Sequence, residues 1–257
     1  MDYNYHTHTA RCRHAKDADE EYILRAIEGG IKYMGFSDHA PYIFPDGYES
    51  NYRVECTAIS DYFSSLYALR KKYRDKIDLK IGFELEYYPN HFEKMLKASL
   101  DAGAEYLILG QHYIYDEHPK GLATRFLTEN PEHLIEYVSC ILAGMKSGVF
   151  TYVAHPDLLR FTKDEALYHK EMSKICYASK EYDIPLEINF LGIREGRFYP
   201  RDRFWELAGE IGSPITFGFD AHDKDAAYDT ESLKVAHELV TRYNLNYIGK
   251  PKIIYLQ

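Results

Sequence analysis

The alternation of short β-rich runs with helical patterns is the sequence feature that most restricts the fold. Seven such runs, rich in aromatic, aliphatic and β-branched residues, occur at 3–5, 33–37, 79–84, 106–110, 152–154, 186–189 and 215–219. Helical patterns separate the runs, and the last pattern, at 232–247, is followed by a short apolar tail. Strand and helix alternation predicts parallel strands joined by right-handed crossovers. The expected fold is therefore α/β, an irregular (β/α) barrel of seven strands.

The chain length fits one such barrel. Its 257 residues lie within the size that α/β barrels reach as one unit, and no linker, repeat or low-complexity stretch divides them. We therefore expect a single domain over residues 1–257. Two longer connections, at 41–57 and 112–130, are rich in Tyr, Pro, Asp and Glu and are expected to form lids or substrate walls.

The charge balance excludes some classes of partner. The formal net charge is -9, whereas a protein whose main partner is nucleic acid typically carries a basic surface. No apolar run approaches the roughly 18 residues of a membrane span, and the N-terminus has no basic stretch followed by an apolar one. A cytoplasmic protein with no membrane partner is expected. Most of the 25 tyrosines are expected on half-buried surfaces, where the ring packs and the hydroxyl stays in contact with water.

The cysteines restrict the chemistry of any metal site. All four are widely separated and form no C-x-x-C pair, a pattern that fits reduced packing thiols better than disulfides or a thiolate zinc site: Cys12, Cys56, Cys140 and Cys176. Any metal here is expected to use nitrogen and oxygen ligands.

Side chains that can bind metals follow every expected strand. The seven strand ends read HTH, SDH, FELE, GQH, AHPD, EIN and FDAH. Seven of the twelve histidines lie at or just after these ends: His6, His8, His14, His39, His112, His155 and His222. Because successive side chains of a strand alternate faces, residues two positions apart point the same way. His6 therefore points the same way as His8, and Asp220 the same way as His222.

Each of these motifs alone has an ordinary structural interpretation. An H-x-H pair is often exposed or packed, AHPD suits a strand-to-turn junction, Glu84 or Glu86 could face solvent, and Asp220 could cap a helix. In a barrel, however, all these ends meet at one mouth, where several imidazoles and carboxylates would be crowded without a cation. The sequence therefore predicts a metal site, and mixed imidazole and carboxylate ligands suit zinc, iron or manganese.

The ordered set of H-x-H, SDH, G-x-E, a strand-end His, A-H-P-D and a closing D-x-H resembles the polymerase and histidinol phosphatase (PHP) superfamily, and it spans nearly the whole chain. The stretches HTARCRHA, GFSDHAP, GFELEY, GQHYI, AHPDLLR and EINFLGIREGRFYP resemble its histidinol-phosphatase branch. The resemblance implies a distorted, TIM-barrel-like (β/α)7 barrel with two to three divalent metal ions at the C-terminal ends of its parallel strands.

The resemblance also implies three sets of ligands. The first metal would be held by His6, His8, Glu84 and Asp220. The second would share Glu84 and add His112 and His155, and the third would be held by His14, His39 and His222. Choosing Glu84 over Glu86 rests on the G-x-E match, since both face the same way. His14 has an alternative interpretation as an ordinary loop histidine, and Cys12 is expected to be a packing thiol.

The implied activity is the hydrolysis of L-histidinol phosphate to L-histidinol and phosphate in L-histidine biosynthesis, by a monomer or homodimer. Asp220 or His222 would pass a proton to the departing alkoxide. Arg160 and Arg197 are expected to bind the phosphate, with Arg194 as a competitor. Three residues of one loop are candidates for contacting the amine and imidazole of this small-molecule substrate: Tyr113, Asp116 and Glu117.

Two other functions remain open from the sequence. A PHP-type phosphoesterase that acts on nucleotides or DNA ends would use the same metals, but it would be expected to carry a basic, aromatic-lined groove. A non-catalytic metal-binding scaffold would be expected to have lost ligands, whereas every ligand position here is occupied.

Overall fold

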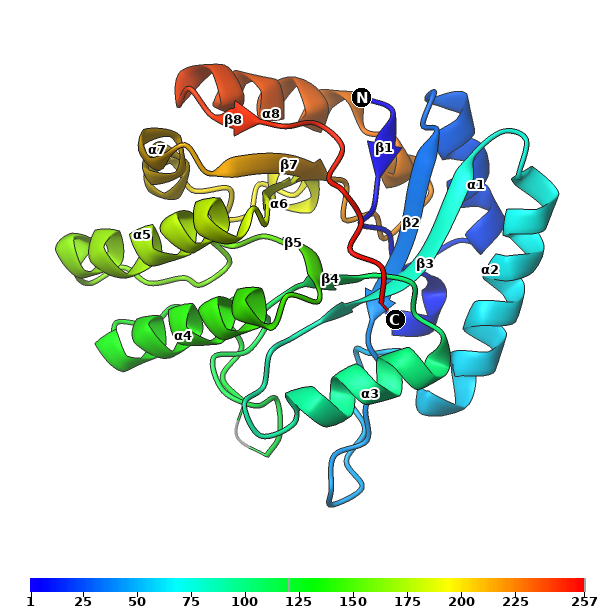
Figure 1. Cartoon of the computed structure of the whole chain (residues 1–257), viewed down its shortest axis with the longest axis horizontal. Helices are drawn as coiled ribbons and strands as arrows, with labels where there is room; N and C mark the ends of the chain where they lie inside the picture. Colours follow the sequence, from blue (N-terminus) through cyan, green and yellow to red (C-terminus); the bar gives the residue numbers. More distant parts are fainter. Residues whose placement is uncertain (120, 257) are drawn as a thin grey trace.

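The computed structural model describes residues 1–119 and 121–256 and contains one curled sheet of eight parallel strands (Figure 1). The strands follow one another in chain order around the sheet: β1 (Tyr3–Asn4), β2 (Tyr33–His39), β3 (Asp78–Leu85), β4 (Leu107–Leu109), β5 (Phe150–Val153), β6 (Leu186–Asn189), β7 (Pro214–Gly218) and β8 (Asn246–Tyr247). All seven expected strands are present within a few residues of the expected bounds. The predicted distorted, TIM-barrel-like α/β fold is confirmed.

The barrel closes between the first and seventh strands, at the mouth. Just beyond these two strands, Thr7 forms a parallel bridge with Ala221. The backbone N–H of His8 donates to the Ala221 carbonyl at 2.9 Å, and the Ala221 N–H donates to the His6 carbonyl at 3.2 Å. These bonds tie the two strand ends that carry H-x-H and D-x-H directly to each other.

The eighth strand corrects the expected helix at 232–247. The helix α8 (Thr230–Arg242) ends earlier, and Asn244 adopts a left-handed backbone with φ 48° that turns the chain. β8 then pairs with the opposite end of β7, where Pro214 faces Asn246. It therefore fills the gap that opens between β1 and β7 away from the mouth.

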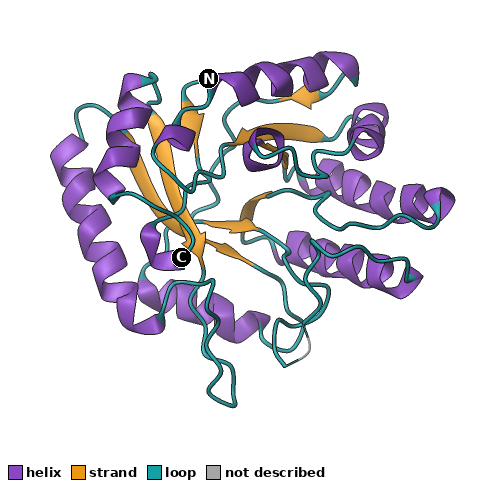
Figure 2. Ribbon diagram, turned by 180° about the vertical axis from the view of Figure 1, so that it is seen from behind, coloured by secondary structure: helices purple, strands orange, loops and turns teal. Residues whose placement is uncertain are grey.

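Helices cover the outer side of the sheet (Figure 2). The expected helices are α1 (Asp19–Glu28), α2 (Ile59–Tyr73), α3 (Phe92–Ala102), α4 (Pro131–Ser147), α5 (Glu165–Tyr182), α7 (Asp202–Ile211) and α8. A short helix that was not expected, α6 (Phe190–Arg194), follows β6, and single 3₁₀ turns occur at Ala10–Cys12, Cys56–Ala58 and Asp225–Ala227. Within residues 1–119 and 121–256, no helix is both long and apolar enough to cross a membrane.

Tyrosines fill the inside of the barrel beneath the mouth. Tyr3, Tyr5, Tyr106 and Tyr152 form one buried cluster, and Ile253 of the C-terminal tail packs against it. The expectation that tyrosines lie on half-buried surfaces is therefore wrong for these residues. The tail runs across this end of the barrel (Figure 1), and the cavity lies at the other end, among the strand ends.

Candidate metal centre

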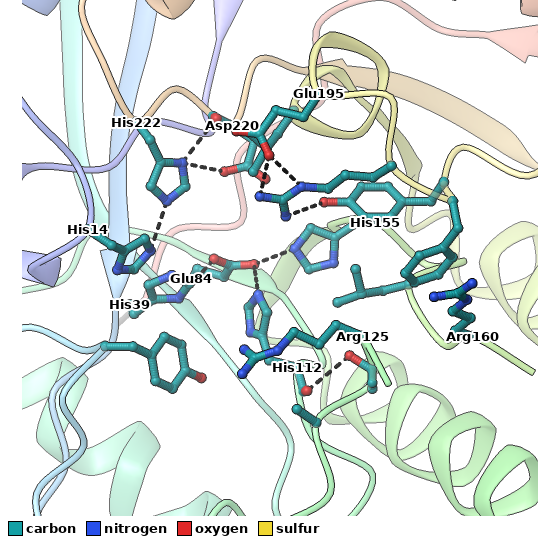
Figure 3. Close-up of a pocket in the computed structure, with 18 of the residues that line it drawn as sticks. His14, His39, Glu84, His112, Arg125, His155, Arg160, Glu195, Asp220 and His222 are labelled. Carbon is teal, nitrogen blue, oxygen red and sulfur yellow. Dashed lines mark hydrogen bonds and ion pairs between the residues drawn. The ribbon is translucent and has the colours of Figure 1, made fainter. Parts of the chain in front are cut away.

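The polar strand ends meet in one cavity of about 960 Å³ (Figure 3). Its floor contains the strand-end side chains Glu84, His112, His155 and Asp220. Part of its wall comes from the two long connections, which contribute Asn51, Tyr52, Tyr113, Ala123, Thr124 and Arg125. Residues of both the 41–57 and 112–130 connections therefore line the cavity, and their role as lids or substrate walls stays a prediction.

Four side chains at the bottom of the cavity face one another. Nε2 of His6 lies 3.5 Å from a carboxylate oxygen of both Glu84 and Asp220. Nε2 of His8 lies 3.6 Å from Glu84 and 3.2 Å from Asp220. Of the atoms that the structure describes, none is a hydrogen-bond partner for these two nitrogens, for Oε2 of Glu84 or for Oδ1 of Asp220, although all four are buried. A divalent cation bound between these four atoms would give each of them a partner, because imidazole nitrogens and carboxylate oxygens are metal ligands.

Carboxylates behind the two histidines fix the orientation of their rings. Glu187 Oε1 lies 2.8 Å from Nδ1 of His6, and Asp38 Oδ1 lies 3.4 Å from Nδ1 of His8. A carboxylate at Nδ1 favours the proton there and leaves Nε2 as a lone-pair donor, as in the carboxylate–histidine pairs of metal sites. Sequence reasoning missed Glu187 and Asp38 in this role. Their only sequence signal is their position in EIN and SDH.

The charge of this group is arranged to attract a cation. Burial alone would raise the pKa of Glu84, but neighbouring imidazoles, chiefly that of His112, hold it well below its ordinary value. The pKa of Asp220 is likewise held well below its ordinary value against burial, chiefly by His6. Burial would lower the pKa of His6, but Glu187 and the other carboxylates raise it to about 10. The negative potential that would protonate His6 would equally attract a metal ion.

Glu84 lies between this first group of ligands and a second group. Its Oε1 lies 2.9 Å from Nε2 of His155 and 3.5 Å from Nε2 of His112, whereas its Oε2 faces the first group. The Nδ1 of His112 faces Oε1 of Glu86 at 2.9 Å. The structure therefore places Glu84, and not Glu86, between the two groups, which is the position expected of a bridging ligand.

A third group lies beside the first. The ring nitrogens of His14, His39 and His222 lie within 4.8 Å of one another, and Nε2 of His14 is 3.0 Å from Nε2 of His222. Burial and the neighbouring charge on His222 lower the pKa of His14 to about 4, so its imidazole is neutral and free to act as a ligand. Although His14 belongs to a loop, its ring thus lies in the cluster. Cys12 is fully buried, with Sγ 3.8 Å from His14 Nε2.

Two of these side chains are held on an unusual backbone. His155 has φ 31° and Asp220 has φ 46°, both in the left-handed region that residues other than glycine rarely adopt. Such conformations cost roughly 1–3 kcal/mol each and cluster at functional sites. They turn the residues that follow β5 and β7 into the cavity.

The structure separates the three candidate arginines. Arg160 and Arg197 line the cavity, as expected of phosphate-binding residues. The Arg194 guanidinium is instead bound 3.1 Å from Asp229 and donates to the Asp220 carbonyl at 3.3 Å, so it supports the loop after β7. Arg125 also lines the cavity (Figure 3) and was missed, because its loop offered no strand end to anchor a prediction.

The loop residues expected to contact the amine and imidazole are also separated. Tyr113 lines the cavity. Glu117 is buried, with Oε2 2.8 Å from Nε of Arg53, and Asp116 accepts a hydrogen bond from Asn90 at 3.2 Å. Tyr113 is therefore the member of this trio placed to meet a substrate. Glu195 is a carboxylate in the cavity lining that sequence reasoning did not consider, and it pairs with Arg197 at 2.6 Å.

Comparisons with known proteins agree with this geometry. The PHP domain family model matches residues 4–190. A "Probable histidinol-phosphatase" of Deinococcus radiodurans is 26% identical over 84% of this chain and 85% of its own, and the histidinol-phosphatase of Bacillus subtilis is 24% identical over 88% and 96%. The fold is shared with the crystal structure of histidinol phosphate phosphatase from Lactococcus lactis, complexed with zinc, L-histidinol and phosphate. That structure is 21% identical over 96% of this chain and 95% of its own, with a TM-score of 0.70.

Proposed function

The chain belongs to the PHP domain family, and we propose that it is a metal-dependent histidinol-phosphatase that hydrolyses L-histidinol phosphate to L-histidinol and phosphate. The proposal that the activity depends on a metal rests on four buried nitrogen and oxygen atoms without hydrogen-bond partners, one each on His6, His8, Glu84 and Asp220. The substrate is supported by the names of the similar proteins, which cover nearly the whole chain.

Two to three divalent ions, zinc, iron or manganese, are proposed for the three groups. His6, His8, Glu84 and Asp220 would hold the first ion; Glu84 would be shared with the second, which His112 and His155 complete; and His14, His39 and His222 would hold the third. When bound, such ions neutralise charge on the phosphoryl oxygens and activate water for attack on phosphorus. This contribution matters because the uncatalysed hydrolysis of phosphate monoesters is among the slowest reactions in biology.

The chain's own side chains would orient the substrate and move the proton. Arg160 and Arg197 would hold the non-bridging oxygens of the phosphate, with Arg125 as a third cation in the same cavity. Asp220 and His222 are in contact, 3.2 Å apart, and line the same cavity. Either Asp220 or His222 would pass a proton to the departing alkoxide, directly or through water, and His222 would do so only while it is not bound to the third ion.

Replacing Arg197 with methionine is expected to lower kcat/KM for histidinol phosphate roughly 10- to 100-fold. Hydrogen bonds to charged groups contribute roughly 1.5–3 kcal/mol, and each 1.36 kcal/mol is tenfold. The loss should fall mainly on KM if Arg197 binds the phosphate equally before and during reaction. Steady-state kinetics would measure it, with Arg242→Met on α8, which is 56% exposed and outside the cavity lining, as the control. Equal values for the two variants would contradict the assignment.

A substrate panel tests the proposed function against its two alternatives. Phosphate release would be measured from histidinol phosphate, nucleoside monophosphates and single-stranded DNA, beside metal analysis of the purified protein. We expect preferred release from histidinol phosphate, and growth of a histidine-requiring host that lacks this phosphatase when the chain is supplied. Preference for the nucleic-acid substrates would favour the phosphoesterase alternative, and bound metal without release from any of them would favour the scaffold.

A further inference from the structure

A completely buried arginine lies between the two long connections that wall the cavity. Arg53 belongs to the 41–57 connection, and its side chain is 0% exposed. Its segment returns to the end of β2, where Nη1 of Arg53 donates to the Ala40 carbonyl at 3.1 Å and the Val54 N–H donates to the His39 carbonyl at 3.2 Å. The guanidinium is thus held at the end of β2, where its Nη2 also donates to Oη of Tyr52, a residue that lines the cavity.

Two buried carboxylates from different segments hold the charge of Arg53. Nη2 of Arg53 lies 2.7 Å from Oε2 of Glu86, which follows β3, in an ion pair. Nε of Arg53 donates to Oε2 of Glu117, in the 112–130 connection, at 2.8 Å. Burying a cation is costly unless its partners are well placed, and replacing such a group with apolar residues is often neutral or stabilising. Packing stability alone is therefore a weak reason for placing a buried arginine here.

Through Glu86, Arg53 reaches the metal centre. The second oxygen of Glu86, Oε1, faces Nδ1 of His112 at 2.9 Å and accepts a hydrogen bond from Tyr52 Oη at 2.5 Å. On its other side, Nε2 of His112 faces Glu84 at 3.5 Å (Figure 3). The ring of His112 is 21% exposed at the edge of the cavity, so packing alone does not fix it. The contact of Nδ1 with Glu86 therefore orients the ring. Arg53 in turn fixes Glu86.

Through Glu117, Arg53 also reaches the opposite wall. Glu117 lies in the same connection as Tyr113 and Arg125, which both line the cavity, and Tyr52, next to Arg53, lines it from the other connection. The ion pair at 2.8 Å therefore fastens one wall to the other in the buried part of the two connections, whereas a second contact, between His118 and Asp46 at 2.7 Å, joins them where Asp46 is exposed.

We propose that Arg53 is a positioning residue with two effects: it orients the proposed metal ligand His112 through Glu86, and it joins the two substrate walls through Glu117. The inference rests on the proposed function, because it takes His112 as a ligand and the cavity as the substrate site. Arg53 itself touches neither metal nor substrate.

The test compares Arg53→Lys with wild type. Lysine keeps the charge but cannot hold Glu86 and Glu117 together with a planar fork. Loss of a partner that orients a ligand typically weakens metal binding or activity by about 10–100-fold. We therefore expect one of the bound metals to dissociate about 10–100-fold more readily, in competition with a chromophoric chelator, and the visible spectrum of the cobalt(II)-loaded protein to change. The kcat should fall with it.

Glu117→Gln separates the two effects, because it loosens the wall and leaves the pair of Arg53 with Glu86. We expect KM for histidinol phosphate to rise several-fold, with metal affinity close to wild type. The matched control is Arg70→Lys on α2, whose guanidinium pairs with Glu105 at 2.6 Å at the opposite end of the strands. It should leave metal affinity, spectrum and KM unchanged.

Wild-type metal affinity and an unchanged cobalt spectrum in Arg53→Lys, with only a lower melting temperature, would overturn the proposal by making Arg53 purely structural. If Arg53→Lys does not fold, an unchanged KM in Glu117→Gln would overturn it. The metal measurements need no substrate, so they stand even if the panel assay shows a different substrate. Absence of metal from the wild type would instead contradict the proposed function.

Discussion

Replacing Glu84 with glutamine is expected to abolish tight binding of at least one metal ion and to lower phosphate release roughly 10³-fold or more. Glu84 is fully buried, and its two oxygens face imidazoles of the first two proposed groups and, at 3.1 Å, Nδ1 of His39 in the third. A neutral amide would therefore replace a charge that all three groups share. A Lewis-acid metal contributes several kcal/mol to the transition state, and each 1.36 kcal/mol is tenfold. Metal content after dialysis and kcat on histidinol phosphate would measure the change.

The control is Glu93→Gln, an exposed glutamate in the first turn of α3. It makes the same chemical change away from the cavity and should keep metal content and kcat at wild-type values. If Glu84→Gln also kept its full metal content and turned over substrate at the wild-type rate, the metal centre proposed around Glu84 would be refuted.

The fold was largely predictable because its strands are consecutive in sequence and space. Each strand after β1 follows a helix, and each strand pairs with the next one in the sequence, so the alternation of strands and helices predicts the order of strands in the sheet. The exceptions are elements too short to leave a pattern. β8 has two residues and α6 has five, and the sequence around Asn246 continues the apolar spacing of the helix before it. Pairing with the free end of β7 makes Asn246 a strand residue, and no local preference encodes that contact.

The sequence predicts which side chains of the site lie close together. It does not predict which atoms of those side chains face one another. Parallel strands bring HTH, FELE and FDAH to one mouth, and this follows from the fold. Whether Nδ1 or Nε2 of His6 faces the cavity depends on Glu187, more than 180 residues away in sequence. The same limit explains the arginines, because Arg194 and Arg197 lie three residues apart and only contacts with Asp229 and the loop after β7 turn Arg194 away.

The position of Glu84 depends on Gly110, which directly follows the neighbouring strand β4. A Cβ on Gly110 would lie 1.8 Å from Oε1 of Glu84 and 2.5 Å from its Cδ, far inside contact distance. Because Gly110 does not have a positive φ, alanine fits its backbone, and the change acts only through the displaced carboxylate. Oε1 is the oxygen that His155 and His112 share. The absence of a side chain at Gly110 thus keeps this oxygen in place.

Gly110→Ala is therefore expected to weaken metal binding and to lower kcat by roughly 10²-fold or more, because a misplacement of about 1 Å can cost that much. Overpacking should also cost about 1–3 kcal/mol of stability. Gly144→Ala is the matched control, because its Cβ would meet the Leu109 side chain at 2.6 Å, on the side of β4 that faces α4. It should lower the melting temperature comparably and leave metal content and kcat intact. If the two variants lost stability equally and both kept metal and turnover, the carboxylate of Glu84 would not be the fixed centre of the site.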